Sequence, residues 1–173
     1  GQLLKRTAAE QGVAIVPTDS EHNAMFQGME QRHDVEKLIL TASGGPFRNT
    51  PRAELRNVTP DRALAHPRWD MGQKISIDSA TLFNKGLELI EAAYLFDMPD
   101  SQIEVVVHPQ SIVHSLVAYR DGSVLAQMGE PDMRTPILHA LTWPDRRQPG
   151  PAKRLDLVAL SQLDFEALDT DRF

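Results

Sequence analysis

The sequence of 173 residues contains no cysteine. This excludes disulfide scaffolds, thiolate zinc sites and cysteine nucleophiles, so any metal must be bound by oxygen or imidazole ligands. No stretch approaches the ~20 apolar residues that cross a bilayer, and the first residues lack the apolar segment of a signal peptide. We therefore expect a cytoplasmic protein with no membrane partner.

Positive charge is also scarce. Lys and Arg number 18 against 24 Asp and Glu, which gives a net charge of -6. This balance argues against the broad basic surface that neutralises nucleic-acid phosphates. With 41% hydrophobic residues the chain can bury one substantial core. Small molecules and proteins are the expected partners, and nucleic acid is not.

Apolar patterning predicts an α/β fold of the α+β type, in which a mixed sheet with an antiparallel hairpin packs against helices. The predicted strands are residues 13–18, 38–43, 74–78 and 103–108, with a hairpin over 111–119 and 123–129. The predicted helices are residues 2–11, the stretch from Asp78 or Ser79 to Phe96, and a short one within 131–144.

Two segments are predicted to be irregular. Pro46, Pro51, Pro60 and Pro67 punctuate residues 44–72, which reads as a long excursion with one short helix. Loops of this length are usually lids or disordered, and we expect an active-site lid. The chain from Asp145 onward is expected to be extended and partly exposed.

The stretch DSEHN at 19–23 crowds charge behind an apolar run. In an extended segment Asp19 and Glu21 project to the same side, which suits a hard divalent cation. Alternatively, Asp19 or Ser20 caps a helix that begins at Glu21. Taken alone, the pair favours the helix cap.

The predicted helix after Asp78 has one polar and one apolar side. At helical spacing the polar side carries Thr81, Asn84, Lys85 and Glu88, and the apolar side carries Phe83, Leu87, Ile90 and Tyr94. A solvated surface helix would show the same stripe. The same amide, ammonium and carboxylate, with Ser79, could also bind phosphate and metal together. The helix by itself leaves both interpretations open.

Other polar residues stand in or near predicted loops. Ser43 and the following two glycines could approach a phosphate, although a tight strand exit explains the glycines equally well, and no nucleotide-binding glycine motif occurs. Trp69 could cover a ligand or anchor its loop to the core. His22, His108 and His114 read first as satisfied buried histidines.

Six stretches, in order along the chain, resemble the 1-deoxy-D-xylulose 5-phosphate reductoisomerase family. They are DSEHN, TASGGPFRNTP, HPRWDMG, KISIDSATLFNKGLELIEA, VVVHPQSIVHSLV and PDMRTP. The resemblance runs from about Gly12 to the C-terminus, and SATLFNKGLE and SGGPFR are its most specific parts. Arg68 departs from it, since asparagine is expected there in many members.

The resemblance implies a metal site and a substrate site. Asp19, Glu21 and Glu88 would bind Mg²⁺ or Mn²⁺, with Co²⁺ as a third candidate, and these three with Lys85 and His66 would form the catalytic set. The implied substrate-binding residues are Ser20, Ser43, Ser79, Asn84, Lys85, His66, Trp69 and Met71, with Ser111 and His114 as minor contacts. Met133 and Gly72 would lie near the cofactor NADPH.

The resemblance also implies a reaction and a domain order. Members split and rejoin the carbon skeleton of a sugar phosphate and reduce the resulting aldehyde with NADPH, in non-mevalonate isoprenoid biosynthesis. Residues 1–150 would form a central catalytic and dimerisation domain of a homodimer, and 151–173 would lead towards a helical domain. The NADPH-binding domain would lie outside this chain, so we expect the fragment alone to be inactive.

Two other functions are compatible with the same residues. A metal-dependent sugar-phosphate hydrolase or lyase could use the three carboxylates without NADPH. A catalytically silent dimerisation module could retain them without turnover.

Overall fold

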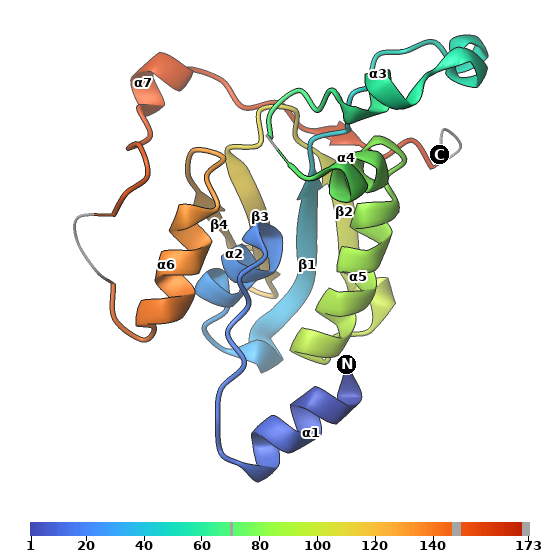
Figure 1. The fold of residues 1–173 in the computed structure, drawn as a ribbon. Coiled ribbons are helices and arrows are strands. Elements are labelled where there is room, and N and C mark those ends of the chain that lie inside the picture. The colour runs from blue at the N-terminus through green and yellow to red at the C-terminus, as the bar shows by residue number, and fades with distance from the viewer. Residues whose placement is uncertain (70, 147–149, 171–173) are drawn as a thin grey trace.

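The computed structural model of this chain describes residues 1–69, 71–146 and 150–170. At its centre lies a five-stranded mixed sheet in the order β4-β3-β1-β2-β5 (Figure 1). The strands are β1 (Val35–Ala42), β2 (Ile103–Val107), β3 (Val113–Tyr119), β4 (Val124–Met128) and β5 (Glu166–Ala167). The mixed sheet, packed against helices, confirms the predicted fold class.

Strand pairing sets the two faces of the sheet. β1 runs parallel to β2, with Leu38 opposite Ile103, and antiparallel to β3. β3 and β4 form the predicted hairpin, whose turn includes Gly122 at φ +90°. Because side chains alternate along a strand, Leu38 and its neighbour Ile39 face opposite sides of the sheet.

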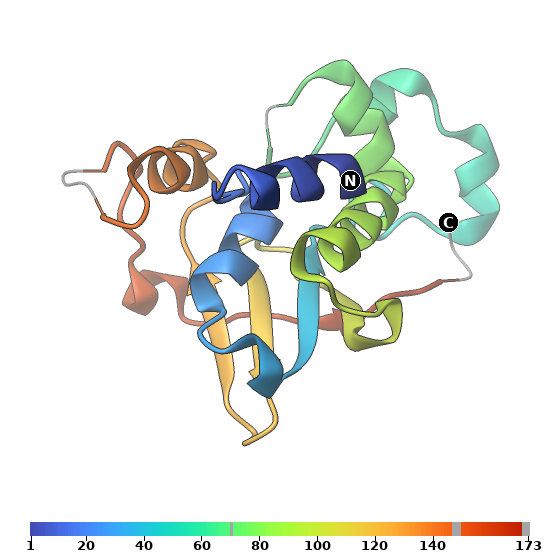
Figure 2. The same cartoon turned by 90° about the horizontal axis from the view of Figure 1, so that it is seen from below.

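Helices cover one face of this sheet. The two that matter most are α2 (Ser20–Gly28), which packs on β3 and β4, and α5 (Phe83–Phe96), which packs on β1 and β2 (Figures 1 and 2). The other α-helices are α1 (Gln2–Glu10), α3 (Pro60–Leu64), α4 (Gln73–Ala80), α6 (Arg134–Thr142) and α7 (Leu157–Leu160). The short 3-10 helices are η1 (Arg32–Asp34), η2 (Arg52–Asn57) and η3 (Asp100–Gln102). Each helix within the described residues is too short or too polar to traverse a bilayer.

The main core lies between these helices and the sheet. Met25 of α2 and Ala92 and Phe96 of α5 pack with Leu38 and Leu40 of β1. Met25, Leu38 and Leu40 are completely buried, and burying each such side chain stabilises the fold by about 1.5–3 kcal/mol. This core fixes α2 and α5 side by side, which matters for the site described below.

The strand predicted at 13–18 is wrong. Within the described residues the segment has no strand partner, and it connects α1 to α2 on the helical side of the sheet (Figure 1). Val13 is 59% exposed there. β-Branched residues gave a local preference for extended backbone, but a strand forms only where a neighbouring strand pairs with it. The helix predicted at 2–11 is confirmed, and Gly12 after it has φ +62°.

The strand predicted at 74–78 is also wrong, because these residues belong to α4. The alternation of Ile75 and Ile77 suggested a strand, yet the structure buries Ser76 and Ala80, which are four residues apart on one helical face. The predicted helix to Phe96 is interrupted at Leu82, whose φ of 57° is left-handed, and α5 begins only at Phe83.

The irregular segments contain more structure than expected. Residues 44–72 include η2 and α3, and the stretch after Asp145 includes α7 and the short strand β5. Asp156 caps α7 by accepting hydrogen bonds from the backbone N–H groups of Val158 and Ala159. The short helix before Pro144 is present as α6.

Candidate metal and substrate site

Asp19 and Glu21 lie at the N-terminus of α2. Asp19 is the N-cap, and its Oδ1 accepts hydrogen bonds from the backbone N–H groups of Glu21 and His22, at 3.1 and 3.3 Å. Glu21 stands in the first turn, where the helix dipole favours a negative charge. The two carboxylates are therefore brought together by the capped start of a helix and not by an extended chain.

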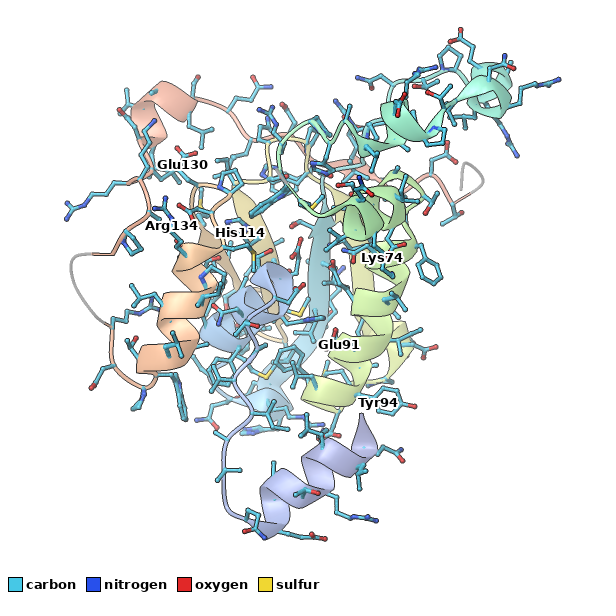
Figure 3. All side chains as sticks on the ribbon, viewed as in Figure 1. Lys74, Glu91, Tyr94, His114, Glu130 and Arg134 are labelled. Atoms are coloured by element: carbon cyan, nitrogen blue, oxygen red, sulfur yellow. The ribbon has the colours of Figure 1, made fainter. Side chains whose placement is uncertain are left out.

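α5 supplies the opposite wall with Asn84, Lys85 and Glu88. Lys85 and Glu88 are only 8% and 4% exposed, so the polar side of this helix points inward. The apolar side points outward, with Phe83 58% and Tyr94 47% exposed. Figure 3 labels Tyr94 at the outer edge of α5, on the side away from α2. A solvated polar stripe is thus excluded for this part of α5.

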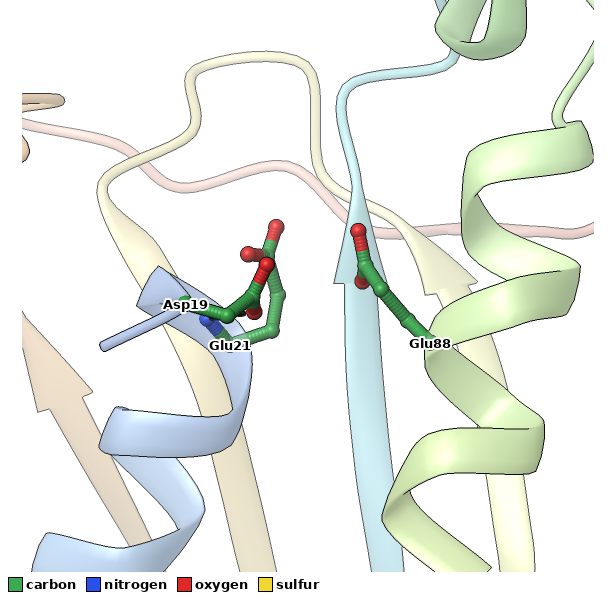
Figure 4. Close-up of side chains that lie close together, drawn as sticks. All are labelled: Asp19, Glu21 and Glu88. Atoms are coloured by element: carbon green, nitrogen blue, oxygen red, sulfur yellow. Dashed lines mark hydrogen bonds between the residues drawn. The ribbon is translucent and has the colours of Figure 1, made fainter. Parts of the chain in front are cut away.

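The three acidic side chains converge between α2 and α5 (Figure 4). One potential ligand atom from each of Asp19, Glu21 and Glu88 lies within 4.8 Å of the others. The Lys85 ammonium forms ion pairs with both glutamates, at 3.1 Å from Glu21 Oε1. Asn84 donates a hydrogen bond to Glu88, so the carboxylate of Glu88 is oriented from two sides.

Two neighbours orient the acidic groups further. Ser20 Oγ donates to Glu21 Oε2 at 2.5 Å. His22 is almost fully buried, and its Nε2 lies 2.9 Å from the backbone oxygen of Glu88. Because a carbonyl only accepts, Nε2 carries the proton, and His22 thereby ties α2 to α5 beside the cluster.

Burial and mutual repulsion shift the pKa values of the cluster. Burial, and next the Glu21 carboxylate, raise the pKa of Glu88 to about 8, and the same two causes raise the pKa of Asp19. Burial alone would raise the pKa of Glu21, but the Lys85 ammonium and hydrogen bonds from Ser20 and Lys85 bring it below its usual value. Burial likewise opposes the charge of Lys85, yet the two glutamates raise its pKa.

The donor set fits a hard divalent cation. Three carboxyl groups crowd around one ammonium, and each offers the oxygen ligands that Mg²⁺ and Mn²⁺ prefer. A cation bound among them would relieve the repulsion that raises the pKa of Glu88. The residues present therefore suit the metal that the family resemblance implied.

The acidic cluster opens into a cavity of about 220 Å³. Nine further residues of its lining had predicted roles, and they are Ser20, Ser43, Trp69, Met71, Asn84, Lys85, Ser111, His114 and Met133. His114 lies near the start of β3 (Figure 3). His66, Gly72 and Ser79 were also predicted for the site, but none of them is part of the lining.

His66 reaches the cavity through Ser43. Its Nδ1 accepts from the backbone N–H groups of Arg68 and Trp69, so Nε2 carries the proton and donates to Ser43 Oγ at 3.0 Å. The Gly45 N–H also donates to Ser43 Oγ, at 3.2 Å. With both acceptor positions occupied, the Ser43 hydroxyl has its own proton to donate to an anion. Burial lowers the pKa of His66, which favours this neutral form.

Three lining residues were not predicted from the sequence. Ile75 and Val113 contribute apolar surface, and Thr41 donates hydrogen bonds to the backbone oxygens of Val113 and His114 at 2.8 and 2.9 Å. Their side chains carry no distinctive chemistry for this site. Only the positions of Thr41 and Val113, at the ends of adjacent strands, could have suggested them.

Comparisons with known proteins agree with this geometry. The family model described as 1-deoxy-D-xylulose 5-phosphate reductoisomerase C-terminal domain matches residues 15–96, and that described as DXP reductoisomerase C-terminal domain matches 128–173. The reductoisomerase of Pseudomonas fluorescens strain Pf0-1 is 58% identical over 180 residues, covering 100% of this chain and 45% of that protein. The enzyme of Cellvibrio japonicus is 57% identical over 184 residues, covering 100% of this chain and 46% of its own length.

Solved structures of the same name are similar throughout. The Zymomonas mobilis reductoisomerase in complex with NADPH has a TM-score of 0.90 and 55% identity, covering 99% of this chain and 44% of that one. A DOX-P reductoisomerase in complex with NADPH, fosmidomycin and magnesium has a TM-score of 0.94 and 50% identity, with 99% and 45% coverage. The chain spans less than half the length of the curated relatives it matches.

Proposed function

This chain belongs to the 1-deoxy-D-xylulose 5-phosphate reductoisomerase family, and we propose that it forms the metal-binding and substrate-binding part of such an enzyme. The whole enzyme would convert 1-deoxy-D-xylulose 5-phosphate to 2-C-methyl-D-erythritol 4-phosphate with NADPH. The observation that carries this proposal is the convergence of Asp19, Glu21 and Glu88 beside the buried ammonium of Lys85.

The acidic cluster would hold the divalent cation, Mg²⁺ or Mn²⁺, and Co²⁺ is the third candidate for the same oxygen ligands. When bound, such a cation stabilises negative charge on substrate oxygens. A solved relative in complex with magnesium supports this part of the proposal. Asn84 and Lys85 orient Glu88 and remain close enough to the cavity to contact a bound sugar phosphate.

Hydrogen-bond donors at the cavity would bind the phosphate and hydroxyl groups. Ser43 has its hydroxyl proton to donate, and Lys85 brings a positive charge. Ser20, whose hydroxyl proton is donated to Glu21, would accept a hydrogen bond from a substrate hydroxyl group. Holding the phosphate at one end would position the reacting carbons near the acidic cluster. Ser79 stays a prediction as a phosphate ligand, since it would have to turn towards the cavity.

The segment with Trp69 and Met71 would close over the substrate and exclude water, with His66 as its attachment to Ser43. Met133 lines the cavity from the loop before α6 and would contact the nicotinamide, with Gly72 nearby on the lid side. NADPH itself would be held mainly by a part of the enzyme that this chain does not include. The Zymomonas relative in complex with NADPH supports the choice of cofactor.

A metal-dependent hydrolase or lyase is not favoured, because the relatives that match the entire chain are named reductoisomerases. If the chain is instead a catalytically silent dimerisation module, Glu21→Gln or Glu88→Gln should leave the turnover of the whole enzyme unaltered. Both readings can be tested directly.

Calorimetric titration of the chain with Mn²⁺, and then with fosmidomycin, tests the proposal. Binding of fosmidomycin should require Mn²⁺, and Glu88→Gln should weaken Mn²⁺ binding by roughly a hundredfold, because one of the three anionic ligands is lost. Glu10→Gln, the same substitution on α1 with a side chain 61% exposed, is the control and should bind as the unchanged chain does. Equal Mn²⁺ affinity in both variants would contradict the site.

Turnover can be measured in a hybrid enzyme. The chain would replace the matching residues of the Pseudomonas fluorescens relative, to which it is 58% identical. We expect oxidation of NADPH that depends on both 1-deoxy-D-xylulose 5-phosphate and the metal. Substrate consumption without NADPH oxidation would instead support a hydrolase or lyase.

We also propose a homodimer that uses the uncovered face of the sheet. Ile39, Leu116 and Ala126 are paired across β1, β3 and β4 on the face opposite the helices, with Val124 on the same face and 50% exposed. Val124→Lys should therefore shift sedimentation towards the monomer, whereas Leu3→Lys on α1 should not.

A cytoplasmic location follows from the proposed use of NADPH, which is regenerated in that compartment.

A further inference from the structure

Residues 162–167, here called the C-terminal strap, cross one end of the sheet and finish as β5. In Figure 1 this part of the chain passes behind the ends of β3 and β1 to reach β2. Glu166 and Ala167 pair with Val107 and Val106 of β2. The strap thus lies against the turn that follows β2, although that turn is distant from it in the sequence.

His108, the first residue of that turn, is fully buried and bonded through both ring nitrogens. Its Nδ1 lies 2.7 Å from the backbone oxygen of Asp164, and its Nε2 lies 3.1 Å from the backbone nitrogen of Ile112. A carbonyl accepts and an N–H donates, so Nδ1 carries the proton and Nε2 is the acceptor. The ring also stacks on Phe165, with 4.7 Å between centroids.

The turn that His108 holds presents Ser111 to the cavity. The Ser111 N–H donates to the backbone oxygen of His108 at 3.1 Å, and Ser111 has a left-handed φ of 54°. That conformation is uncommon for a serine and needs support from its surroundings. His108 supplies it by binding Ile112 on the far side of Ser111, whose side chain lines the cavity.

A second set of bonds joins the same turn to the strap. Gln110 Nε2 donates to Asp164 Oδ2 at 2.5 Å, and the Asp164 N–H donates to Gln110 Oε1 at 3.3 Å. Arg48, which follows the glycines after β1, pairs with Glu166 at 2.5 Å. The strap is therefore attached to two loops that border the cavity.

The other side of the turn receives the predicted lid. Arg68 Nε donates to the backbone oxygen of Pro109 at 3.1 Å, and the Trp69 ring lies 6.2 Å from the His114 ring. The turn at 108–112 thus stands between the strap and the lid and touches both.

We propose that His108 is a positioning residue, which transmits the placement of the C-terminal strap to Ser111 and to the lid residue Arg68. This inference rests on the proposed function, because it assigns a consequence for ligand binding at the same cavity. The His108 ring touches neither the cavity nor the acidic cluster. It acts through the two backbone bonds that fix the turn.

The alternative, that the His108 side chain only fills space, predicts a different outcome. His108→Phe keeps an aromatic ring that can stack on Phe165 but removes both hydrogen bonds. If the ring only packs, this variant should bind ligands as the unchanged chain does. If the two bonds position the turn, ligand binding should weaken while the metal site on α2 and α5 remains intact.

The test uses the chain with Trp143→Phe, which leaves Trp69 as the sole tryptophan reporter. Fosmidomycin is titrated in the presence of saturating Mn²⁺ and followed by Trp69 fluorescence, and Mn²⁺ affinity is measured separately. We expect His108→Phe to weaken fosmidomycin binding roughly tenfold, from the loss of two hydrogen bonds. Its Mn²⁺ affinity should stay within about twofold of the parent, since no acidic ligand is touched.

His108→Asn is the conservative variant, because its side-chain amide can again donate to the Asp164 oxygen. It should recover part of the affinity that His108→Phe loses. If His108→Phe does not fold, Gln110→Ala, which leaves the buried ring in place, takes over the comparison and should weaken fosmidomycin but not Mn²⁺. Unchanged fosmidomycin affinity, or an equal loss of both affinities, would overturn the proposal.

Hydrogen exchange separates this inference from the proposed function. The Ile112 amide should exchange at least tenfold faster in His108→Phe than in the parent, because its acceptor is removed. If the parent binds neither Mn²⁺ nor fosmidomycin, the proposed function fails, and equal Ile112 exchange in both proteins would then overturn the role of His108 as well. Faster exchange would uphold its role in holding the turn.

Discussion

The two ends of the α2–α5 pair bury opposite chemistry within one layer. At one end Met25 meets Ala92 and Phe96 over the sheet, and at the other Glu21 meets Lys85 and Glu88. Both ends exclude water from most of their side chains. The apolar end gains stability from burial, whereas the charged end must offset the desolvation of several ions.

This contrast indicates what each end is for. Apolar side chains of similar volume would stabilise the helix pair at least as well as the ions do. The ions are therefore better explained by ligand binding than by stability. The apolar end supplies the rigidity that keeps two distant acidic segments in register.

Replacing the central ammonium should have the largest effect. Lys85→Met removes the cation between Glu21 and Glu88 and should lower the free energy of unfolding by about 4 kcal/mol without metal, because buried carboxylates lose their partner. Saturating Mn²⁺ should restore most of this loss. Urea unfolding followed by circular dichroism measures both values.

The control for that change is Lys74→Met, which removes an exposed lysine paired with Asp78. It should change the free energy of unfolding by no more than about 0.5 kcal/mol. Equal losses in the two variants would show that Lys85 is no more than a surface ion pair in solution.

A cavity at the apolar end should come next in size. Leu38→Ala should lower the free energy of unfolding by about 3 kcal/mol, since the side chain is fully buried among residues of both helices. Leu4→Ala, the same substitution at a residue of α1 that is 61% exposed, should lower it clearly less. An equal loss at Leu4 would contradict the role of the buried core in this prediction.

Adding metal should strengthen the charged end alone. Mn²⁺ at about 100 times its dissociation constant should raise the free energy of unfolding by about 2.7 kcal/mol, through binding to the folded state. In Glu88→Gln the same Mn²⁺ concentration should give little increase. Comparable stabilisation of both proteins would place the cation elsewhere.

The smallest effect should come from the exposed charges at the C-terminal end of α5. A hydrogen bond from Lys5, together with the charges of Lys5 and Arg32, lowers the pKa of Asp97. A carboxyl group with a lowered pKa stabilises the fold above its unfolded pKa of about 4, and this contribution is lost as pH falls through the folded value.

We expect that contribution to stay below about 1 kcal/mol, because Asp97 is well exposed and screened by solvent. Asp97→Asn, which tolerates the left-handed backbone there, should remove it. Comparing urea unfolding of the two proteins at pH 7 and pH 3 measures the difference, which should be smaller at pH 3 than at pH 7.

Local patterns predicted the elements whose signals are local. The apolar run of β2, the turn around Gly122 and the helix ended by Pro144 all appear where expected. The strands predicted at 13–18 and 74–78 are wrong, because strand formation depends on a neighbouring strand that a single segment does not encode. α4 in addition buries Ser76 and Ala80, which carry little apolar signal.

The candidate site was partly readable in the same way. The residues alone favoured Asp19 as a helix cap over a metal ligand, and the structure makes it the cap while also placing it in the acidic cluster. The approach of Glu88 from a segment 67 positions after Glu21 depends on tertiary packing, and only the family resemblance anticipated it. The inward turn of the polar side of α5 likewise depends on what α2 brings opposite it.

Gly45 shows how closely two backbones meet at the rim of the site. It has φ +66°, and a Cβ built on it would lie 2.8 Å from the backbone oxygen of Ser79. Any other amino acid would both strain that residue and push α4 away from the loop containing Ser43. Substitutions at this position should therefore not be tolerated, even though its side chain, a single hydrogen, takes no part in chemistry.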